Sequence, residues 1–339
     1  MSATGPHHLS PPRPARRQET PMPRVPPRRI TFIGIGAIGL PMAEQLLAAG
    51  FEVTGVDPYP DQRARAASRG VPAEETPVSA AQADVVVCMV ATPEQLRTAA
   101  LGAEGVLQHM RKGSALVVMS TVGPRAVREV ADAAPPTVRV LDVPVTGGVT
   151  RAVTGELSLF ASGDPATIED VRPVLDALGA LIDCGPEIGQ GQSYKAVNQL
   201  LCSVHIVAAA EALAFAEELG LDPRKVLPAV AGGAGGSWML SDRGPRMLQG
   251  PDAEVTSTIG IFVKDSTLVQ DIADEIGFDA PMVTAAQAKY RAAQEAGWER
   301  QDDSQVIRTY RRRPSPRPGA PGEHGGEDDP QRRSSPRTR

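Results

Sequence analysis

Short apolar runs alternate with helix-like segments along the first half of the chain. Ile30–Ile33 is predicted to be a buried strand, Pro41–Ala49 a helix, and Glu52–Asp57 a second strand, which together form a βαβ unit. This alternation predicts an α/β fold built on a mostly parallel, doubly wound sheet. The later apolar runs that continue the strand series are Asp84–Val90, Ala115–Met119, Val138–Leu141 and Leu157–Ser162.

The pattern changes after about residue 190. Gln192–Leu219 is rich in Ala, Leu and Glu, contains no Gly or Pro, and predicts one long helix. Asp222-Pro223 then offers a capping residue and a first-turn proline for the next helix. We therefore expect a first domain at 29–190 and an all-α second domain at 191–310.

Both ends of the chain differ in composition from the part between them. Residues 1–29 contain six arginines and one glutamate, and residues 311–339 contain eight arginines and four acids, which leaves 21 basic and 35 acidic residues between. Both ends are also rich in proline, so tails at 1–28 and 311–339 are predicted to be disordered. Binding of these tails to nucleic acid or to an acidic partner is the alternative, but no nucleic-acid partner is expected.

Composition excludes several classes of protein. The three cysteines are far apart and show no metal-ligand spacing, so neither a disulfide framework nor a metal site is expected. The longest uninterrupted apolar run, Val85–Ala91, is much shorter than the roughly 20 residues of a membrane span, and the N-terminus has no apolar signal segment. The sequence therefore predicts a cytoplasmic protein without a membrane partner.

A glycine-rich segment joins the first predicted strand to the first predicted helix. Its glycines Gly34, Gly36 and Gly39 have the G-x-G-x-x-G spacing of a dinucleotide-binding turn, in which the phosphates lie at the helix N-terminus. Asp57 ends the second strand 21 residues after Gly36, where a carboxylate accepts hydrogen bonds from the ribose hydroxyls. We expect a Rossmann domain that binds NAD, with NADP disfavoured by the charge of Asp57. The alternative is that Asp57 only caps the turn before Pro58.

Two later segments combine glycines with polar side chains. The first is Asp142–Gly148, in which the hydroxyl of Thr146 stands beside Gly147 and Gly148, a suitable cradle for a carboxylate, although a plain glycine turn would look the same. The second is Gly189–Gln199. Within it, Lys195, Asn198 and Gln199 fall at i, i+3 and i+4 and therefore share one helical face.

Taken in order, these segments resemble the β-hydroxyacid dehydrogenase family, which includes 3-hydroxyisobutyrate dehydrogenase. The resemblance covers about residues 30–310 and starts with Phe32–Ala43, where Ile38 replaces the family's usual methionine. It implies that Ile38 and the three glycines contact the cofactor, that Thr146, Gly147, Gly148 and Gln199 bind the substrate, and that Lys195 is the general acid/base with Asn198 orienting it. Arg151 stands where the family more often has glycine.

The same resemblance assigns two further cofactor contacts. Ser120-Thr121-Val122 is similar to the family's loop near the nicotinamide ribose, and Lys264-Asp265 is similar to a pair whose lysine reaches the cofactor. The resemblance therefore implies that Thr121 and Lys264 contact the cofactor.

The reaction that the resemblance implies also needs a proton acceptor. Hydride transfer requires a base for the hydroxyl proton of the substrate, and burial is one way to lower the pKa of a lysine toward neutrality.

Within the family, several stretches resemble the L-threonate dehydrogenases, which implies a four-carbon sugar acid as substrate. Tartronate semialdehyde reductase and 3-hydroxyisobutyrate dehydrogenase activities remain open, because a pocket separates such acids by only about 1–3 kcal/mol. The stretches that carry the subfamily resemblance are Asn198–Leu201, Val204–Ile206, Ser237–Met239, Ile261–Asp265, Asp302–Ser304 and Val306–Ile307.

Other activities are less compatible with the sequence. Imine reduction is disfavoured by Lys195, a 6-phosphogluconate dehydrogenase is disfavoured by the chain length, and an NAD-binding sensor is the non-enzymatic alternative. Trp238 is interpreted as core or pocket wall and His205 as structural. The apolar helices favour a homo-oligomer.

Overall fold

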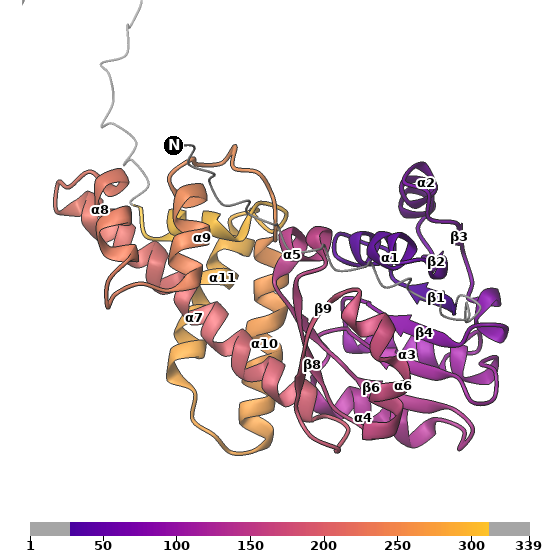
Figure 1. The fold of residues 1–339 in the computed structure, drawn as a ribbon. Helices are drawn as coiled ribbons and strands as arrows, with labels where there is room; N and C mark the ends of the chain where they lie inside the picture. Colours follow the sequence, from indigo (N-terminus) through magenta and orange to yellow (C-terminus); the bar gives the residue numbers. More distant parts are fainter. Residues whose placement is uncertain (1–27, 312–339) are drawn as a thin grey trace, which may run out of the picture.

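The computed structural model describes residues 28–311, so nearly all of the two predicted tails lies outside the described residues. Figure 1 shows a sheet-containing half, coloured indigo to magenta, beside a helical half, coloured pink to yellow. This arrangement confirms the predicted α/β domain followed by an all-α domain.

The first half is built on a six-stranded parallel sheet with the order β3-β2-β1-β4-β5-β6. Every residue of β4 and β5 is buried, as expected for parallel strands that are covered by helices on both faces. The strands are β1 (Arg29–Ile33), β2 (Glu52–Val56), β3 (Ala73–Glu74), β4 (Val85–Cys88), β5 (Ala115–Val118) and β6 (Arg139–Asp142).

Helices pack on both faces of this sheet and form two separate apolar cores. One core joins α1 and α6 to the sheet, and the other joins α3 and α4 to the opposite face. The crossover from β3 to β4 contains only a short 3-10 helix. The helical elements of this half are α1 (Gly39–Ala48), α2 (Pro60–Ser68), η1 (Val78–Ala81), α3 (Pro93–Leu101), η2 (Val106–Gln108), α4 (Gly123–Ala133), α5 (Gly148–Thr154) and α6 (Pro165–Asp176).

A second, three-stranded sheet corrects one detail of the sequence prediction. The run at 157–162 was expected to continue the large sheet, but β8 (Leu157–Ala161) pairs antiparallel with β7 (Val145–Thr146) and parallel with β9 (Gly179–Asp183). The physical reason is the turn after β6, where backbone hydrogen bonds between Asp142 and Ser162 of 2.8 and 3.0 Å bring the chain across. The small sheet therefore extends from the end of β6.

The helical half is arranged around α7 (Gln190–Glu218), which packs against α9, α10, α11 and η3 and also touches α4 of the first half. This helix begins two residues before its predicted start because Gly189, at φ +98°, turns the chain into it. The glycine cluster at 232–236 forms the predicted break. The other elements are α8 (Pro223–Ala231), α9 (Trp238–Met247), α10 (Ile259–Glu275), α11 (Pro281–Glu295) and η3 (Asp303–Thr309).

By length and composition alone, α7 is apolar enough to cross a membrane. Half of its most apolar window is buried inside the protein, against the other helices of this half. A helix at the centre of a helical domain satisfies the same test, and α7 occupies that position in Figure 1.

Candidate active site

The predicted dinucleotide turn has the geometry that the cofactor requires. Gly34 adopts φ +88°, and a Cβ there would lie 2.3 Å from the Met89 carbonyl oxygen, so only glycine makes this turn. A Cβ at Gly39 would lie 1.9 Å from the Gly34 carbonyl oxygen, so the absence of a side chain at Gly39 allows α1 to pack closely on β1. A Cβ at Gly36 would meet nothing within 4 Å. Gly36 therefore faces open space, where a pyrophosphate can approach the N-terminus of α1, while Ile38 is half-buried as its N-cap residue.

Asp57 lies just beyond β2 and is only 6% exposed. Its Oδ1 accepts a hydrogen bond of 3.0 Å from the Tyr59 backbone N–H. The guanidinium of Arg63 donates to the backbone carbonyls of Asp57 and Pro58 at 2.8 and 2.9 Å and pairs with Glu75. The carboxylate is thus fixed at the end of β2, the strand next to β1, which is the position predicted for a contact with the ribose of a dinucleotide.

The two remaining predicted cofactor contacts lie together although 143 residues separate them. Lys264 on α10 donates from Nζ to the Thr121 carbonyl oxygen at 3.2 Å. The same Nζ lies 2.7 Å from Oδ1 of the buried Asp265. The loop after β5 and the helix α10 therefore meet in one contact between the two halves of the protein.

The predicted substrate loop touches the predicted catalytic helix. Asn198 on α7 donates from Nδ2 to the Thr146 hydroxyl oxygen at 3.4 Å and to Gln199 Oε1 at 2.8 Å. Gly147 has φ +132°, and the Arg151 side chain folds back over it, since a Cβ on Gly147 would lie 2.8 Å from Arg151 Cδ. Gly148 starts α5 directly after this turn.

Lys195 is 6% exposed and lies on the inner face of α7. Burial lowers the pKa of Lys195 below its usual value, and the positive charge of Lys264 acts in the same direction, while Asp265 and Cys202 oppose the shift. A lysine in this environment carries a neutral amine at lower pH than an exposed lysine does. That is the property required of a proton acceptor.

A hydrogen-bonded chain of side chains connects α7 to α10 beside this lysine. Gln199 donates from Nε2 to Oδ2 of Asp265, whose other oxygen pairs with Lys264. Asn198 also lies 3.4 Å from the Cys202 sulfur, one turn further along α7. The predicted catalytic and substrate residues of α7 are thus brought together with Lys264, while Asp57 and the dinucleotide turn belong to the strands of the large sheet.

Sequence reasoning missed three polar groups that belong to this region. Asp142 and Gln192 belong to segments that the sequence singled out, but no role was predicted for either, and Cys202 was considered only as one of three scattered thiols. No local signal connects Asp142 to Gln192, which are 50 residues apart, yet Gln192 Nε2 donates to Asp142 Oδ1 at 3.0 Å. Trp238 was interpreted as core or pocket wall; its side chain is 51% exposed and lies against Arg243, so it is not part of the core.

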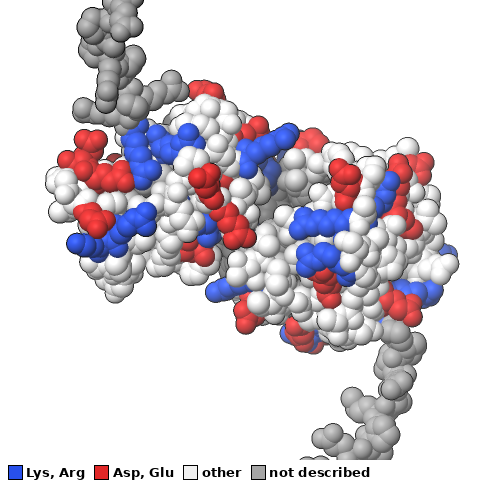
Figure 2. Space-filling model, turned by 90° about the horizontal axis from the view of Figure 1, so that it is seen from above, with Lys and Arg blue, Asp and Glu red and all other residues white. Residues whose placement is uncertain are grey.

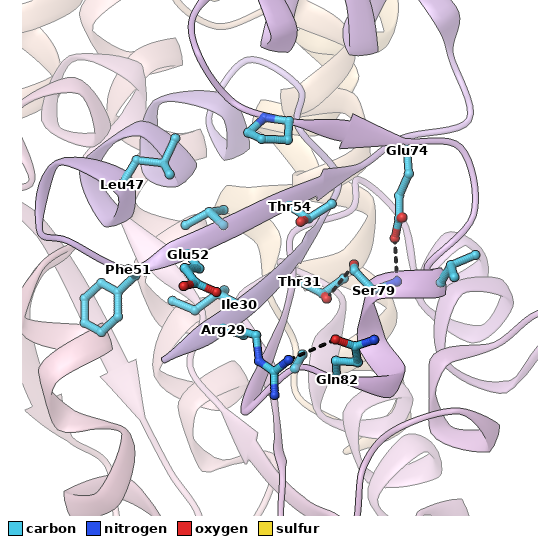
Figure 3. Close-up of a pocket in the computed structure, with 14 residues that line it drawn as sticks. Arg29, Ile30, Thr31, Leu47, Phe51, Glu52, Thr54, Glu74, Ser79 and Gln82 are labelled. Atoms are coloured by element: carbon cyan, nitrogen blue, oxygen red, sulfur yellow. Dashed lines mark hydrogen bonds between the residues drawn. The ribbon is translucent and has the colours of Figure 1, made fainter. Parts of the chain in front are cut away.

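The surface adds two observations. Figure 2 shows acidic and basic side chains interspersed on both lobes, with a hollow between the lobes, so this face presents no continuous patch of one sign. Figure 3 shows another hollow, along β1, β2 and η1, whose polar side chains bind each other: Thr31 with Ser79, and Arg29 with Gln82. None of the predicted site residues lines that second hollow. Among the described residues, no group of His, Cys, Asp and Glu is placed to hold a metal ion.

Two family models together match almost the whole described chain. Residues 29–189 match the NAD-binding domain of 6-phosphogluconate dehydrogenase, and residues 189–310 match the NAD-binding domain of NADP-dependent 3-hydroxyisobutyrate dehydrogenase. The chain therefore contains NAD(P)-binding domains.

Curated relatives and solved structures agree with these models. An L-threonate dehydrogenase of Cupriavidus necator is 36% identical over 84% of this chain and 96% of its own length, and that of Escherichia coli K12 is 34% identical over 83% and 94%. A crystal structure of a 3-hydroxyisobutyrate dehydrogenase from Salmonella typhimurium superposes with a TM-score of 0.77 at 33% identity, over 83% of this chain and 99% of that one.

More distant neighbours include an imine reductase from Myxococcus stipitatus, with a TM-score of 0.54 at 20% identity, which shows a shared fold alone. The relatives at higher identity are named as dehydrogenases or oxidoreductases and cover nearly their full lengths. This chain belongs to the β-hydroxyacid dehydrogenase family, the NAD(P)-dependent oxidoreductases that resemble 3-hydroxyisobutyrate dehydrogenase.

Proposed function

We propose that this protein oxidises a small hydroxy acid by hydride transfer to NAD, with Lys195 as the general acid/base. The observation that carries the proposal is one contiguous set of side chains: a buried lysine with a lowered pKa, on the same helix as an amide that reaches Thr146 of the glycine loop. General acid–base chemistry requires a base with such a pKa within reach of a substrate held nearby.

The residues divide the reaction between them. Thr146, Gly147 and Gly148 receive the substrate carboxylate through a hydroxyl and closely approachable backbone N–H groups. The hydroxyl proton of the substrate passes to Nζ of Lys195, and in the reverse direction protonated Lys195 returns it to the carbonyl oxygen. Bound NAD supplies the acceptor for the hydride that leaves the carbinol carbon. Asn198 and Gln199 orient the substrate and the lysine.

Asp57 favours NAD over NADP as the cofactor. Its carboxylate accepts hydrogen bonds from ribose hydroxyls, whereas a 2′-phosphate would bring a second negative charge next to a buried one. Gly34, Gly36, Ile38, Gly39, Thr121 and Lys264 hold the remainder of the cofactor in this proposal. The boundary between the cofactor domain and the helical domain falls at residue 190, the first residue of α7.

We place L-threonate, or a related four-carbon sugar acid, first among the substrates. Support comes from the names of the Cupriavidus and Escherichia relatives. The alternatives are 3-hydroxyisobutyrate, favoured by the names of solved structures from Salmonella and Mycobacterium tuberculosis, and tartronate semialdehyde in the reducing direction.

Two further parts of the proposal concern the state of the enzyme. Val197, Leu201 and Phe215 of α7 and the following Leu219 are exposed apolar side chains, which a second copy of the chain would cover. We therefore propose a homo-oligomer. The free thiols Cys88 and Cys184 are buried and unpaired, as is usual in the reducing cytoplasm, where we place the reaction.

The test measures NADH formation with L-threonate, D-erythronate, D-glycerate and 3-hydroxyisobutyrate. Lys195→Ala is expected to lower kcat by roughly 100- to 10,000-fold, the range that general acid–base catalysis contributes, while NAD still binds. Lys112→Ala, at an exposed lysine, is the matched control and keeps wild-type activity.

Each outcome of this test distinguishes between the candidate functions. A preference for D-glycerate would move the protein to the semialdehyde reductases. NAD binding without turnover of any acid would favour a sensor. An active Lys195→Ala variant would remove the lysine from the mechanism.

A further inference from the structure

The carboxylate of Asp142 is completely buried at the carboxyl end of β6, although nothing in the reaction proposed above uses it. Its Oδ2 accepts hydrogen bonds from the backbone N–H groups of Gly189 and Gln192, each at 3.0 Å, and from the Ser162 hydroxyl at 3.1 Å. A carboxylate from the Rossmann sheet thus binds the first turn of α7, where backbone N–H groups lack partners within the helix.

Gln192 is 1% exposed and uses its whole side-chain amide. Its Oε1 accepts from the backbone N–H groups of Val122 and Gly123 at 3.0 and 2.9 Å. Its Nε2 donates to the Ser120 carbonyl oxygen at 2.9 Å and to Asp142 Oδ1 at 3.0 Å. Through this one side chain, the first turn of α7 is bound to both ends of the loop that contains Thr121.

The direction of every hydrogen bond in this pair is determined. Because Gln192 Oε1 faces two N–H donors, its Nε2 must face Ser120 and Asp142. The Ser162 oxygen accepts from the Gly191 N–H at 2.9 Å, so its proton is donated to Asp142. Both oxygens of Asp142 must therefore accept, and an asparagine in either orientation would place its NH₂ against another donor.

Burial raises the pKa of Asp142 above its usual value, and the hydrogen bonds from Gln192, Ser162 and Gly189 act against that rise. Replacing one member of such a buried network leaves its partners unsatisfied, and it changes the position of whatever the network holds. What it holds here is the turn of α7 that precedes Lys195, three residues after Gln192.

We infer that Asp142 and Gln192 are positioning residues, which set Lys195 in register with the Thr121 loop and the Thr146 loop; the inference rests on the proposed function of Lys195. Neither side chain touches substrate or cofactor in this role. The Asp142–Gln192 pair acts through the helix, because the three segments it joins supply the cofactor loop, the substrate loop and the general acid/base.

The first test compares Gln192→Met with Gln190→Met. Both changes replace an amide by a thioether of similar size at the start of α7, but Gln190 is half-buried and its Oε1 accepts only from the exposed Glu187 N–H. Misplacement of a catalytic group by about 1 Å can cost on the order of 100-fold. We expect Gln192→Met to lower kcat about 100-fold and, because the Gln192 amide also binds the backbone of the Thr121 loop, to raise the KM for NAD. Gln190→Met is expected to retain wild-type values.

A direct titration of Lys195 separates positioning from simple stabilisation. The rate at which Lys195 is acetylated is followed against pH by peptide mass spectrometry, at a temperature where circular dichroism shows each variant to be folded. In Gln192→Met the first turn of α7 loses its anchor and water reaches Lys195, so the pH at which acetylation of Lys195 is half-maximal rises toward that of an ordinary lysine. In Gln190→Met this pH is expected to stay unchanged. A lower melting temperature with unchanged kcat and midpoint would overturn the inference.

A double-mutant cycle provides the second test. Asp142→Asn alone creates a conflict between its NH₂ and Gln192 Nε2 or the α7 N–H groups, whereas adding Gln192→Met removes one of these conflicts. The double variant is expected to lose no more activity than the worse single variant, and losses that add independently would contradict a coupled pair. If the wild type oxidises none of the acids tested, the acetylation midpoints still decide the inference, so its failure and that of the proposed function are distinguishable.

Discussion

The two ends of the candidate site are built from different parts of the polypeptide. At the cofactor end, the main contributors are backbone groups of one continuous segment, the glycine turn between β1 and α1, together with one carboxylate on the adjacent strand. At the catalytic end, side chains from β6, α7 and α10 meet one another and the backbone of the loop after β5. The comparison teaches that the first end depends on local backbone geometry, whereas the second depends on contacts between distant segments.

The largest expected effect breaks the cofactor end alone. Gly36→Val adds a side chain in space that the protein leaves open, so we expect the fold to persist while the pyrophosphate is blocked and NAD affinity falls roughly 1000-fold, or about 4 kcal/mol. Titration by NADH fluorescence measures it. Gly232→Val, at another glycine with open space around it, serves as the control. Wild-type affinity in Gly36→Val would mean that the dinucleotide does not pass this turn.

A smaller change sharpens the choice between NAD and NADP. Asp57→Ser removes the charge that opposes a 2′-phosphate and leaves Arg63 beside it, so the ratio of kcat/KM for NADP to that for NAD should rise roughly 10- to 100-fold, or about 1.4–2.7 kcal/mol. Asp61→Ser, four residues further on at an exposed site, is the matched control. An unchanged ratio would return Asp57 to the role of a turn residue.

The smallest effect concerns the electrostatics of the catalytic end. Oxidation requires neutral Lys195, so kcat rises with pH through the pKa of this lysine, which burial and Lys264 lower. Lys264→Met should move this limb to higher pH, because a positive neighbour is lost. Asp265→Asn should move it to lower pH, because a negative neighbour is lost. Profiles of kcat at saturating cofactor measure both shifts, and shifts in the same direction would refute this electrostatic account.

Much of the fold and of the cofactor end was predictable because its signals are local. The glycine spacing, the second strand and the long helix at 192–219 correspond to structure within a few residues. The catalytic end was predictable only as a set of segments. Periodicity places Lys195, Asn198 and Gln199 on one face, but it does not reveal that Gln199 meets Asp265 or that Asn198 meets Thr146.

The elements that the sequence did not reveal have weak local patterns. β9 is largely exposed or half-buried, so it lacks the apolar run that identified β4 and β5, and it forms because β8 pairs with it. Trp238 was interpreted as core or pocket wall, yet its side chain is half exposed and lies against the guanidinium of Arg243. Tertiary pairing overrides local preference in both cases.

The helical half has one more property that follows from its ion pairs. Arg243 on α9 is buried against Asp303 of η3, with an Nη2–Oδ2 distance of 3.0 Å, and Asp302 of the same segment accepts from Arg246 at 3.2 Å. A buried guanidinium without its carboxylate costs about 3–5 kcal/mol, a large part of the stability of a whole domain. Asp242 of α9 itself pairs with both guanidiniums, so Arg243 and Arg246 each keep one carboxylate partner before the C-terminal segment is made. During synthesis on the ribosome, α9 therefore gains its complete set of ion pairs only when the last described turn of the chain has emerged.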